Sequence, residues 1–148
     1  LQPSQVGWAN VKDALDFGKY NLEYRDDARR FDSGSYNLAG IWGLGASIEW
    51  LLSFGVDQVW DRVRMLTDRL AAGVKAKGYR VVSSREASEA SGILAFVSDT
   101  HDHTRLVNHL RQEYRTVITT REGRLRVSPH FYNTEEEIEQ LIEHLPGH

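Results

Sequence analysis

The sequence contains no cysteine, one methionine and three prolines in 148 residues. Without cysteine, this chain can form no disulfide, thiolate metal site or cysteine nucleophile, which is compatible with a cytosolic origin. No apolar run approaches the roughly 20 residues of a membrane span, and the start "LQPSQVGWAN" lacks the basic and apolar parts of a secretion signal. The net charge is -3, so nothing favours nucleic acid or an anionic membrane as a partner. We therefore expect a cytoplasmic globular protein.

The first 38 residues have no sustained apolar period, yet they carry scattered aromatic side chains, among them Trp8, Phe17 and Tyr20. The first residue is Leu1 and not methionine, which favours a processed chain or a fragment. We predict that residues 1–38 belong to, or pack on, a domain outside this sequence, with these aromatic side chains exposed here. The alternative is a long ordered loop on its own domain, but long structureless loops are uncommon in compact domains.

Residues 39–148 show clear periods. The stretch "AGIWGLGASIEWLLSFG" places Ile41, Leu44, Ile48 and Leu51 on one helical face, with Gly55 as a stop signal. Three glycines in it, at positions 40, 43 and 45, each cost roughly 1 kcal/mol against alanine, so they suggest close approach of another backbone or a ligand. The apolar residues from Val56 to Val74 keep the 3.6-residue period of a second helix, which Gly78 ends.

The pattern then alternates between strands and helices. Strands are predicted at Tyr79–Val82, Gly92–Ser98, Thr116–Thr120 and Arg124–Ser128, the last two joined by the hairpin turn "REG". Helices are predicted for the stretch "HDHTRLVNHLRQEYR" and from about Thr134. Capping-box spacing at that start is shown by Thr134 with Glu137 and also by Asn133 with Glu136. This α-α-β-β-α-β-β-α order predicts an α+β two-layer domain with a small, mostly antiparallel sheet and helices on one face.

Two motifs carry a family resemblance. The stretch "RFDSGSYNLAGIWGLGASIEWL" resembles the junction of class V aminotransferases that leads into a glycine-rich helix, and "GRLRVSPHFYNTEEEIEQLIEHL" resembles their C-terminal signature. The "VGW" at Val6–Trp8 is similar to a loop of the subset near isopenicillin-N epimerase and selenocysteine lyase. The resemblance implies the small C-terminal domain of a fold type I enzyme over residues 39–148.

The resemblance also implies a cofactor and partners. The family binds pyridoxal 5′-phosphate to a lysine of its large domain, acts on amino acids and forms homodimers. The four lysines here, Lys12, Lys19, Lys75 and Lys77, do not match the Schiff-base motif. This stretch of chain is therefore expected to contain no catalytic residue and to be inactive by itself.

Arg126 is the first candidate substrate-binding residue. A guanidinium binds a planar carboxylate through two charged hydrogen bonds, and a strand fixes its direction. By resemblance, Arg126 matches the arginine that holds the substrate α-carboxylate. The alternative is a surface arginine without a binding role, on the same strand face as Arg124. Arg121 is a second candidate that could contact another acidic group.

Gly34 and Ser35 are the candidate cofactor-binding residues. The turn "SGSYN" offers backbone N–H and hydroxyl groups just before a helix, a pattern suited to phosphate. By resemblance, Ser35 stands where the family often has threonine and contacts the cofactor phosphate of a partner subunit. The alternative is a capping turn with Asn37 as the N-cap.

The remaining polar motifs favour structural interpretations. The group His130, Phe131 and Tyr132 is read as packing at the strand–helix junction, with His130 as a proton carrier the weaker alternative. The "HDH" at His101–His103 has too few ligands for a metal site, so Asp102 near the positive end of the helix dipole is preferred.

The reaction type stays open between transamination, which we favour, epimerisation or racemisation, and β-elimination. Relatives that remove sulfur or selenium carry a cysteine in the loop corresponding to "TTREGR", and here that loop has none. A different class of function is also possible: a stand-alone α+β module that binds a small carboxylate or mediates dimerisation.

Overall fold

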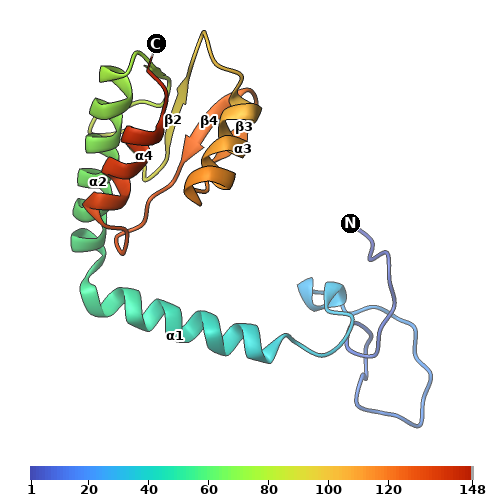
Figure 1. Cartoon of the computed structure of the whole chain (residues 1–148). Coiled ribbons are helices and arrows are strands. Elements are labelled where there is room, and N and C mark those ends of the chain that lie inside the picture. Colours follow the sequence, from blue (N-terminus) through green and yellow to red (C-terminus); the bar gives the residue numbers. More distant parts are fainter. Residues whose placement is uncertain (148) are drawn as a thin grey trace. The chain divides into compact units, whose positions relative to one another are not determined.

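The structure is a computed structural model that describes residues 1–147. It separates into two units, Leu1–Trp50 and Leu51–His148. The elements follow the order η1 (Ala28–Phe31), α1 (Leu38–Phe54), α2 (Val56–Ala76), β1 (Arg80–Val81), β2 (Leu94–Val97), α3 (His103–Tyr114), β3 (Thr119–Arg121), β4 (Arg124–Val127) and α4 (Glu135–His144). From α1 onward this is the predicted order (Figure 1).

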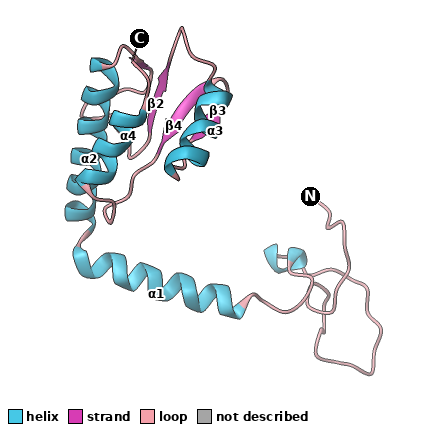
Figure 2. Ribbon diagram, in the orientation of Figure 1, coloured by secondary structure: helices cyan, strands magenta, loops and turns pink. Residues whose placement is uncertain are grey.

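A four-stranded sheet forms the centre of the larger unit. Its strand order is β1-β2-β4-β3, and every neighbouring pair is antiparallel. Because side chains alternate along a strand, one face carries Leu94, Phe96, Leu125 and Val127, all of which are buried. The helices α2, α3 and α4 supply the other half of this core, which confirms the predicted α+β class with helices on one face (Figure 2).

The core is apolar and closely packed. Fully burying a Leu or Phe side chain contributes about 1.5–3 kcal/mol, and several here are completely inaccessible to solvent. The cluster contains Leu66, Leu70, Ala71 and Val74 of α2, Tyr79, Leu94 and Phe96, Leu106 and Leu110 of α3, Ile118, Leu125 and Val127, and Ile138, Leu141 and Leu145 at α4. The 3.6-residue periods seen in the sequence are the buried stripes of these helices.

The β3–β4 hairpin has a two-residue turn, Glu122–Gly123. Both residues have positive φ angles, 48° and 73°, as a type I′ turn requires. This turn matches the right-handed twist of the flanking strands, so it places Arg121 directly opposite Arg124. The predicted hairpin at "REG" is therefore confirmed.

The observed strands are shorter than predicted. The strand expected from Thr116 begins at Thr119, because the chain before it is still finishing α3. Arg115 adopts the left-handed conformation as the C-cap, and the Thr116 N–H donates to the Leu110 carbonyl. The β-branched side chains at 116–118 do indicate extended chain, but pairing with β4 starts only after this cap.

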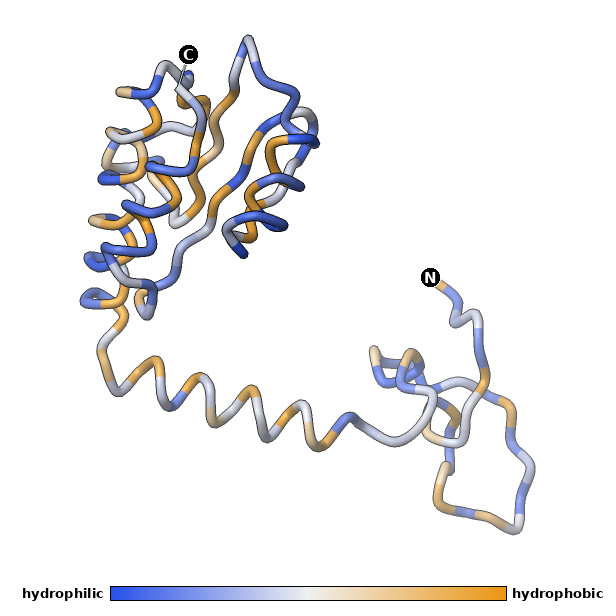
Figure 3. Tube along the Cα trace, in the orientation of Figure 1, coloured by the Kyte–Doolittle hydropathy of each residue, from blue (hydrophilic) through white to orange (hydrophobic). Residues whose placement is uncertain are grey.

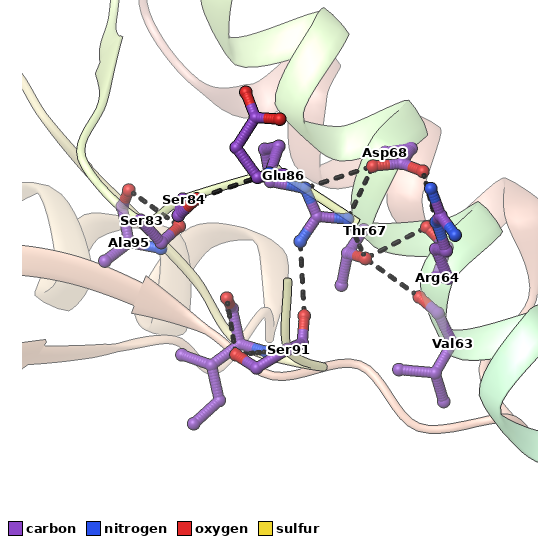
Figure 4. A network of polar contacts seen from close by, with 11 residues as sticks. Val63, Arg64, Thr67, Asp68, Ser83, Ser84, Glu86, Ser91 and Ala95 are labelled. Atoms are coloured by element: carbon purple, nitrogen blue, oxygen red, sulfur yellow. Dashed lines mark hydrogen bonds and ion pairs between the residues drawn. The ribbon is translucent and has the colours of Figure 1, made fainter. Parts of the chain in front are cut away.

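A polar network fastens the loop between β1 and β2 to α2 (Figure 4). The Arg85 guanidinium donates to the Asp68 carboxylate, to the Thr67 hydroxyl at 2.8 Å and to the Ser91 carbonyl at 3.2 Å. The Thr67 hydroxyl in turn donates to the Val63 carbonyl. This network fixes the polar loop that the sequence predicted between the two strands. The loop itself contains no regular secondary structure.

Ion pairs join α2 to α4. Arg62 pairs with Glu135 at 2.9 Å, and Arg69 pairs with both Glu135 and Glu139. The Lys77 amine donates to the carbonyl of Leu145 just past the end of α4. Glu135 and Glu139 of α4 are therefore committed to α2.

The first helix is exposed along its length. No residue of Leu38–Phe54 is buried. The helix is nevertheless poor in charge, since Glu49 is its one charged residue, and in Figure 3 it is coloured mostly as neutral or hydrophobic. The predicted stripe of Ile41, Leu44 and Ile48 is uncovered here. Within the described residues no single helix is long and apolar enough to cross a membrane. Taken together, α1 and α2, which are bent by 82° at Gly55, have the length and apolar composition of a membrane span.

The aromatic side chains of the N-terminal unit are exposed, as predicted. Trp8, Phe17 and Tyr20 are 54%, 82% and 103% exposed. The segment is held instead by a short bridge between Val11 and Tyr24 and by the buried Asn10, whose side chain bonds to Gly7 and Gln5. Its fold rests on polar backbone contacts more than on an apolar core.

Replacing Thr134 by alanine should lower the free energy of unfolding by about 1 kcal/mol. The Thr134 hydroxyl accepts from the Glu137 N–H, and the Glu137 carboxylate accepts from the Thr134 N–H, so the predicted capping box is present. Urea unfolding followed by circular dichroism would measure the change. Thr104→Ala on the exposed face of α3 is the matched control, and an equal loss in both variants would contradict the assignment.

The same box should make stability depend on acid pH. Hydrogen bonds from the Asn133 side chain and then from the Thr134 backbone lower the pKa of Glu137 below 4.5. A lowered folded-state pKa stabilises the fold above the ordinary Glu pKa, and this stabilisation is lost as the pH falls through the lowered value. Glu137→Gln should therefore flatten the fall of the unfolding free energy below about pH 4.5. Parallel pH profiles of the variant and the parent chain would refute this.

Candidate functional site

Arg126 lies in the middle of β4, on the sheet face opposite the helices. Its register partners are Ala95 on β2 and Thr119 on β3, so strands flank it on both sides. Its neighbours Leu125 and Val127 point into the core, which fixes the guanidinium on the open face. Arg126 is half-buried and makes no ion pair or side-chain hydrogen bond within residues 1–147. The structure thus presents a charged fork with its donors available.

Two further arginines share this face. Arg124 follows the two-residue alternation of β4, and Arg121 is its cross-strand partner. Both are exposed, and neither has an ion-pair partner in the part of the chain that the structure describes. Of the predicted site residues, Arg121 and Arg126 are therefore brought to one face of one hairpin.

A braced turn follows β4. Pro129 is buried, and the His130 N–H donates to the Asn133 side chain at 2.8 Å while the Asn133 N–H donates to the His130 carbonyl at 2.9 Å. The Phe131 ring packs against Phe54 with ring centroids 5.0 Å apart. The turn therefore fixes the C-terminal end of β4, two residues beyond Arg126.

His130 is a packing residue in this arrangement. Its ring stacks on Tyr132 with centroids 4.8 Å apart and contacts the edge of Phe131. Its Nδ1 atom is buried without a hydrogen-bond partner within residues 1–147. No partner within the described residues relays a proton to that atom, so the geometry agrees with the packing interpretation.

A cavity of about 320 Å³ lies on the helix side of the sheet, near the end of α3 and the start of β3. Its lining includes Tyr114, Thr116, Ser128, Asn133 and Gln140. None of the predicted site residues lines it. The open sheet face and this cavity are separate features of the larger unit.

Gly34 and Ser35 lie in the N-terminal unit, next to the "VGW" loop. A side chain on Gly7 would overlap the Ser33 carbonyl oxygen at 1.7 Å, and a Cβ on Gly34 would lie 3.5 Å from the Trp8 indole nitrogen. The two motifs that carried the resemblance at this end therefore pack against each other. This contact was not predicted from the sequence. Gly7, directly before Trp8, was the available signal, because a glycine permits the close approach of another stretch of backbone.

The turn at Ser35 leaves a hydroxyl donor available to a ligand. The hydroxyl of Ser35 is exposed and has no partner among residues 1–147. Asn37 caps α1, since its side-chain oxygen accepts from the Gly40 N–H at 3.0 Å. A Cβ at Gly40 would lie 2.4 Å from the Asn37 side chain, which explains this glycine. The capping and phosphate interpretations are compatible, because Asn37 occupies the cap and leaves Ser35 available.

Histidine 103 has a structural role that the sequence did not reveal. Its Nε2 accepts from the Ser98 N–H at 2.9 Å, so its Nδ1 carries the proton and donates to the Gly123 carbonyl at 2.7 Å. The ring therefore links the end of β2 to the hairpin turn. Asp102 caps α3 through the Arg105 N–H, as predicted, and residues 1–147 contain no group of three potential metal ligands.

The four lysines are poorly suited to covalent chemistry. Hydrogen bonds to Glu23 and then to Asp26 raise the pKa of Lys12, and Lys19 pairs with Asp16. Lys77 is bound to carbonyls at the end of α4. Lys75 is exposed on α2. A nucleophilic lysine must lose its proton, usually through burial, and none of these sites provides that environment.

Comparison with known proteins identifies the family of this chain. Residues 1–141 match the model of the class V aminotransferase family. A probable cysteine desulfurase of Methanothermobacter thermautotrophicus is 30% identical over 98% of this chain and 39% of its own length. The chain therefore belongs to the class V aminotransferase family. Membership confirms the predicted family, whose enzymes depend on pyridoxal 5′-phosphate.

Solved structures show the same fold. A cysteine desulfurase of Thermococcus onnurineus superimposes with a TM-score of 0.77 at 20% identity, covering 95% of this chain and 38% of that one. The cystine C-S lyase C-DES, in complex with cysteine persulfide, gives 0.75 at 20% identity over 95% of this chain and 37% of that one. The chain spans about two fifths of the length of the relatives it matches.

We expect no stoichiometric covalent adduct when this chain is mixed with pyridoxal 5′-phosphate, reduced with borohydride and examined by intact-mass spectrometry. The reason is that Lys12 and Lys77 are held as charged donors, that the exposed Lys19 pairs with Asp16 and that Lys75 is exposed on α2. A denatured sample treated in the same way is the control. One reproducible adduct on a single lysine of the folded chain would overturn this expectation.

Proposed function

We propose that this chain is the C-terminal, substrate-closing part of a pyridoxal-phosphate enzyme that acts on an amino acid. The single observation that carries the proposal is the unpaired Arg126 on the open face of the sheet. Residues 39–148 form the small domain in this proposal, and residues 1–38 pack on the large, lysine-bearing domain. The exposed Trp8, Phe17 and Tyr20 support that packing, since large exposed apolar patches mark interfaces.

Arg126 binds the substrate α-carboxylate in this proposal. Its planar guanidinium offers two parallel N–H donors, and a charged pair of such hydrogen bonds is stronger than a neutral one. Glu135 and Glu139 of α4 do not compete for it, because both pair with arginines of α2. The strand and the turn at Pro129 fix its direction, so the carboxylate is held in one orientation.

Ser35 and Gly34 contribute to binding the cofactor phosphate. The Ser35 hydroxyl and the backbone N–H groups of the turn are the donors that a phosphate needs. When bound, the cofactor supplies the electron sink for chemistry at the amino-acid α-carbon. By analogy with the family, the phosphate belongs to a second subunit, and we propose a cytoplasmic homodimer without nucleic-acid or membrane partners.

Transamination remains the first proposal for the reaction, within a subset near isopenicillin-N epimerase and selenocysteine lyase. The relatives named for sulfur chemistry favour a second candidate, β-elimination at a carbon–sulfur bond. The β3–β4 turn holds no cysteine and is two residues long, so no thiol on this hairpin accepts a sulfur atom. Elimination that releases the sulfur-containing product to solvent does not require one. Product analysis of the whole protein with cysteine, cystine and a 2-oxo acid separates the two reactions.

A stand-alone carboxylate-binding module is the alternative from another class. Its open sheet face would suit that role, and the order of elements would permit it. The coding sequence upstream of Leu1 distinguishes the two. A preceding region that ends in a strand and a lysine supports the enzyme, whereas a start codon near Leu1 supports the module.

In the whole enzyme, Arg126→Ala should lower kcat/KM by roughly 100-fold or more, because losing a charged hydrogen-bond pair to a carboxylate costs about 2–4 kcal/mol. Arg126→Lys should recover little of this, since an ammonium cannot reproduce the fork. Arg80→Ala is the matched control, because Arg80 lies on the same sheet face at the opposite edge. Unchanged kinetics in Arg126→Ala would end the proposal.

A further inference from the structure

The hairpin of β3 and β4 opposes two like charges at one register position. Arg121 and Arg124 are direct cross-strand partners, and like charges in that arrangement are destabilising. Neither guanidinium meets a carboxylate within residues 1–147. An arrangement that lowers stability and brings no internal ion pair is typical of a binding function.

The acidic residues of the larger unit do not neutralise this face. Glu135 and Glu139 bond to α2, and Asp68 bonds to Arg85. Glu122 lies in the turn itself, between the two strands, and has no ion pair in the described structure. The open face of the hairpin therefore carries three arginines, with Arg121 and Arg124 beside the turn and Arg126 two residues further along β4, opposite Thr119.

The spacing of these arginines suits two anionic groups on one small molecule. Arg124 and Arg126 are alternate residues of a strand, so their Cα atoms are roughly 6.6 Å apart, and both side chains project to the same face. Long side chains can converge or spread from that spacing. Two carboxylates joined by a short carbon chain can therefore be held at the same time, one by each arginine.

We propose that Arg124, with Arg121 beside it, binds the side-chain carboxylate of a dicarboxylic amino acid whose α-carboxylate is bound by Arg126. This inference rests on the proposed function of Arg126 and adds the substrate class, an aspartate-like or glutamate-like amino acid. The net charge of -3 and the confinement of the patch to one hairpin favour a small dianion over a polyanion.

Competitive binding of carboxylates to the cofactor-loaded whole enzyme tests this assignment without turnover. Glutarate carries two carboxylates, and butyrate is its matched one-carboxylate probe. The parent enzyme should bind glutarate more tightly than butyrate. Arg124→Gln should weaken the binding of glutarate by about 10- to 100-fold, which corresponds to the loss of a charged hydrogen bond. The affinity for butyrate should stay unchanged. Arg121→Gln should produce a smaller change in the same direction.

The variants separate the two levels of the inference. Arg126→Gln should weaken both probes, and if it weakens neither, the proposed function itself fails. A second outcome overturns only the dicarboxylate assignment and leaves the proposed function standing. In it, Arg126→Gln weakens the binding of both probes, whereas Arg124→Gln either weakens the two probes equally or weakens neither. Arg80→Gln, on the same face but at the other sheet edge, should change neither probe. A loss of discrimination in that variant as large as in Arg124→Gln would also overturn the assignment.

Discussion

The antiparallel pairing of β2 with β4 is the constraint on which the larger unit depends. It sets Leu94 opposite Val127 and Phe96 opposite Leu125, so all four side chains enter one core. The same register sets Ala95 opposite Arg126 on the other face. A shift of one residue would exchange the faces, burying the guanidinium and exposing the apolar residues. Core packing and the orientation of Arg126 are therefore consequences of one pairing.

The surrounding elements protect that register. The Glu122–Gly123 turn fixes the pairing of β3 with β4, and the His103 ring links this turn to the end of β2. Beyond β4, Pro129 and Asn133 hold the chain before α4 begins. The hairpin that carries the arginines is thus restrained at its turn and at its exit, while its open face makes no ion pair with any residue from 1 to 147.

Much of this could be predicted from the sequence because the signals are local. The capping box at Thr134, the glycine in the hairpin turn and the helical apolar stripes all act within a few residues, and each is present in the structure. Strand ends were less predictable, since β3 begins where pairing with β4 starts and not where β-branched residues start. The roles of His103 and Gly7 depend on partners 20 or more residues away, which no local pattern encodes. Periodicity alone could not distinguish Arg126 from a surface arginine; the family resemblance supplied that assignment.

The exposed first helix has a practical consequence for handling the protein. Trp42, Leu44 and Trp50 are all exposed on α1. At its inner glycines, Gly43 and Gly45, a Cβ would meet no described atom within 4 Å beyond the adjacent backbone of the helix itself. A helix that exposes bulky apolar side chains beside glycine backbone tends to associate with other apolar surfaces. Produced by itself, this stretch of chain should therefore self-associate and yield poorly as a soluble monomer.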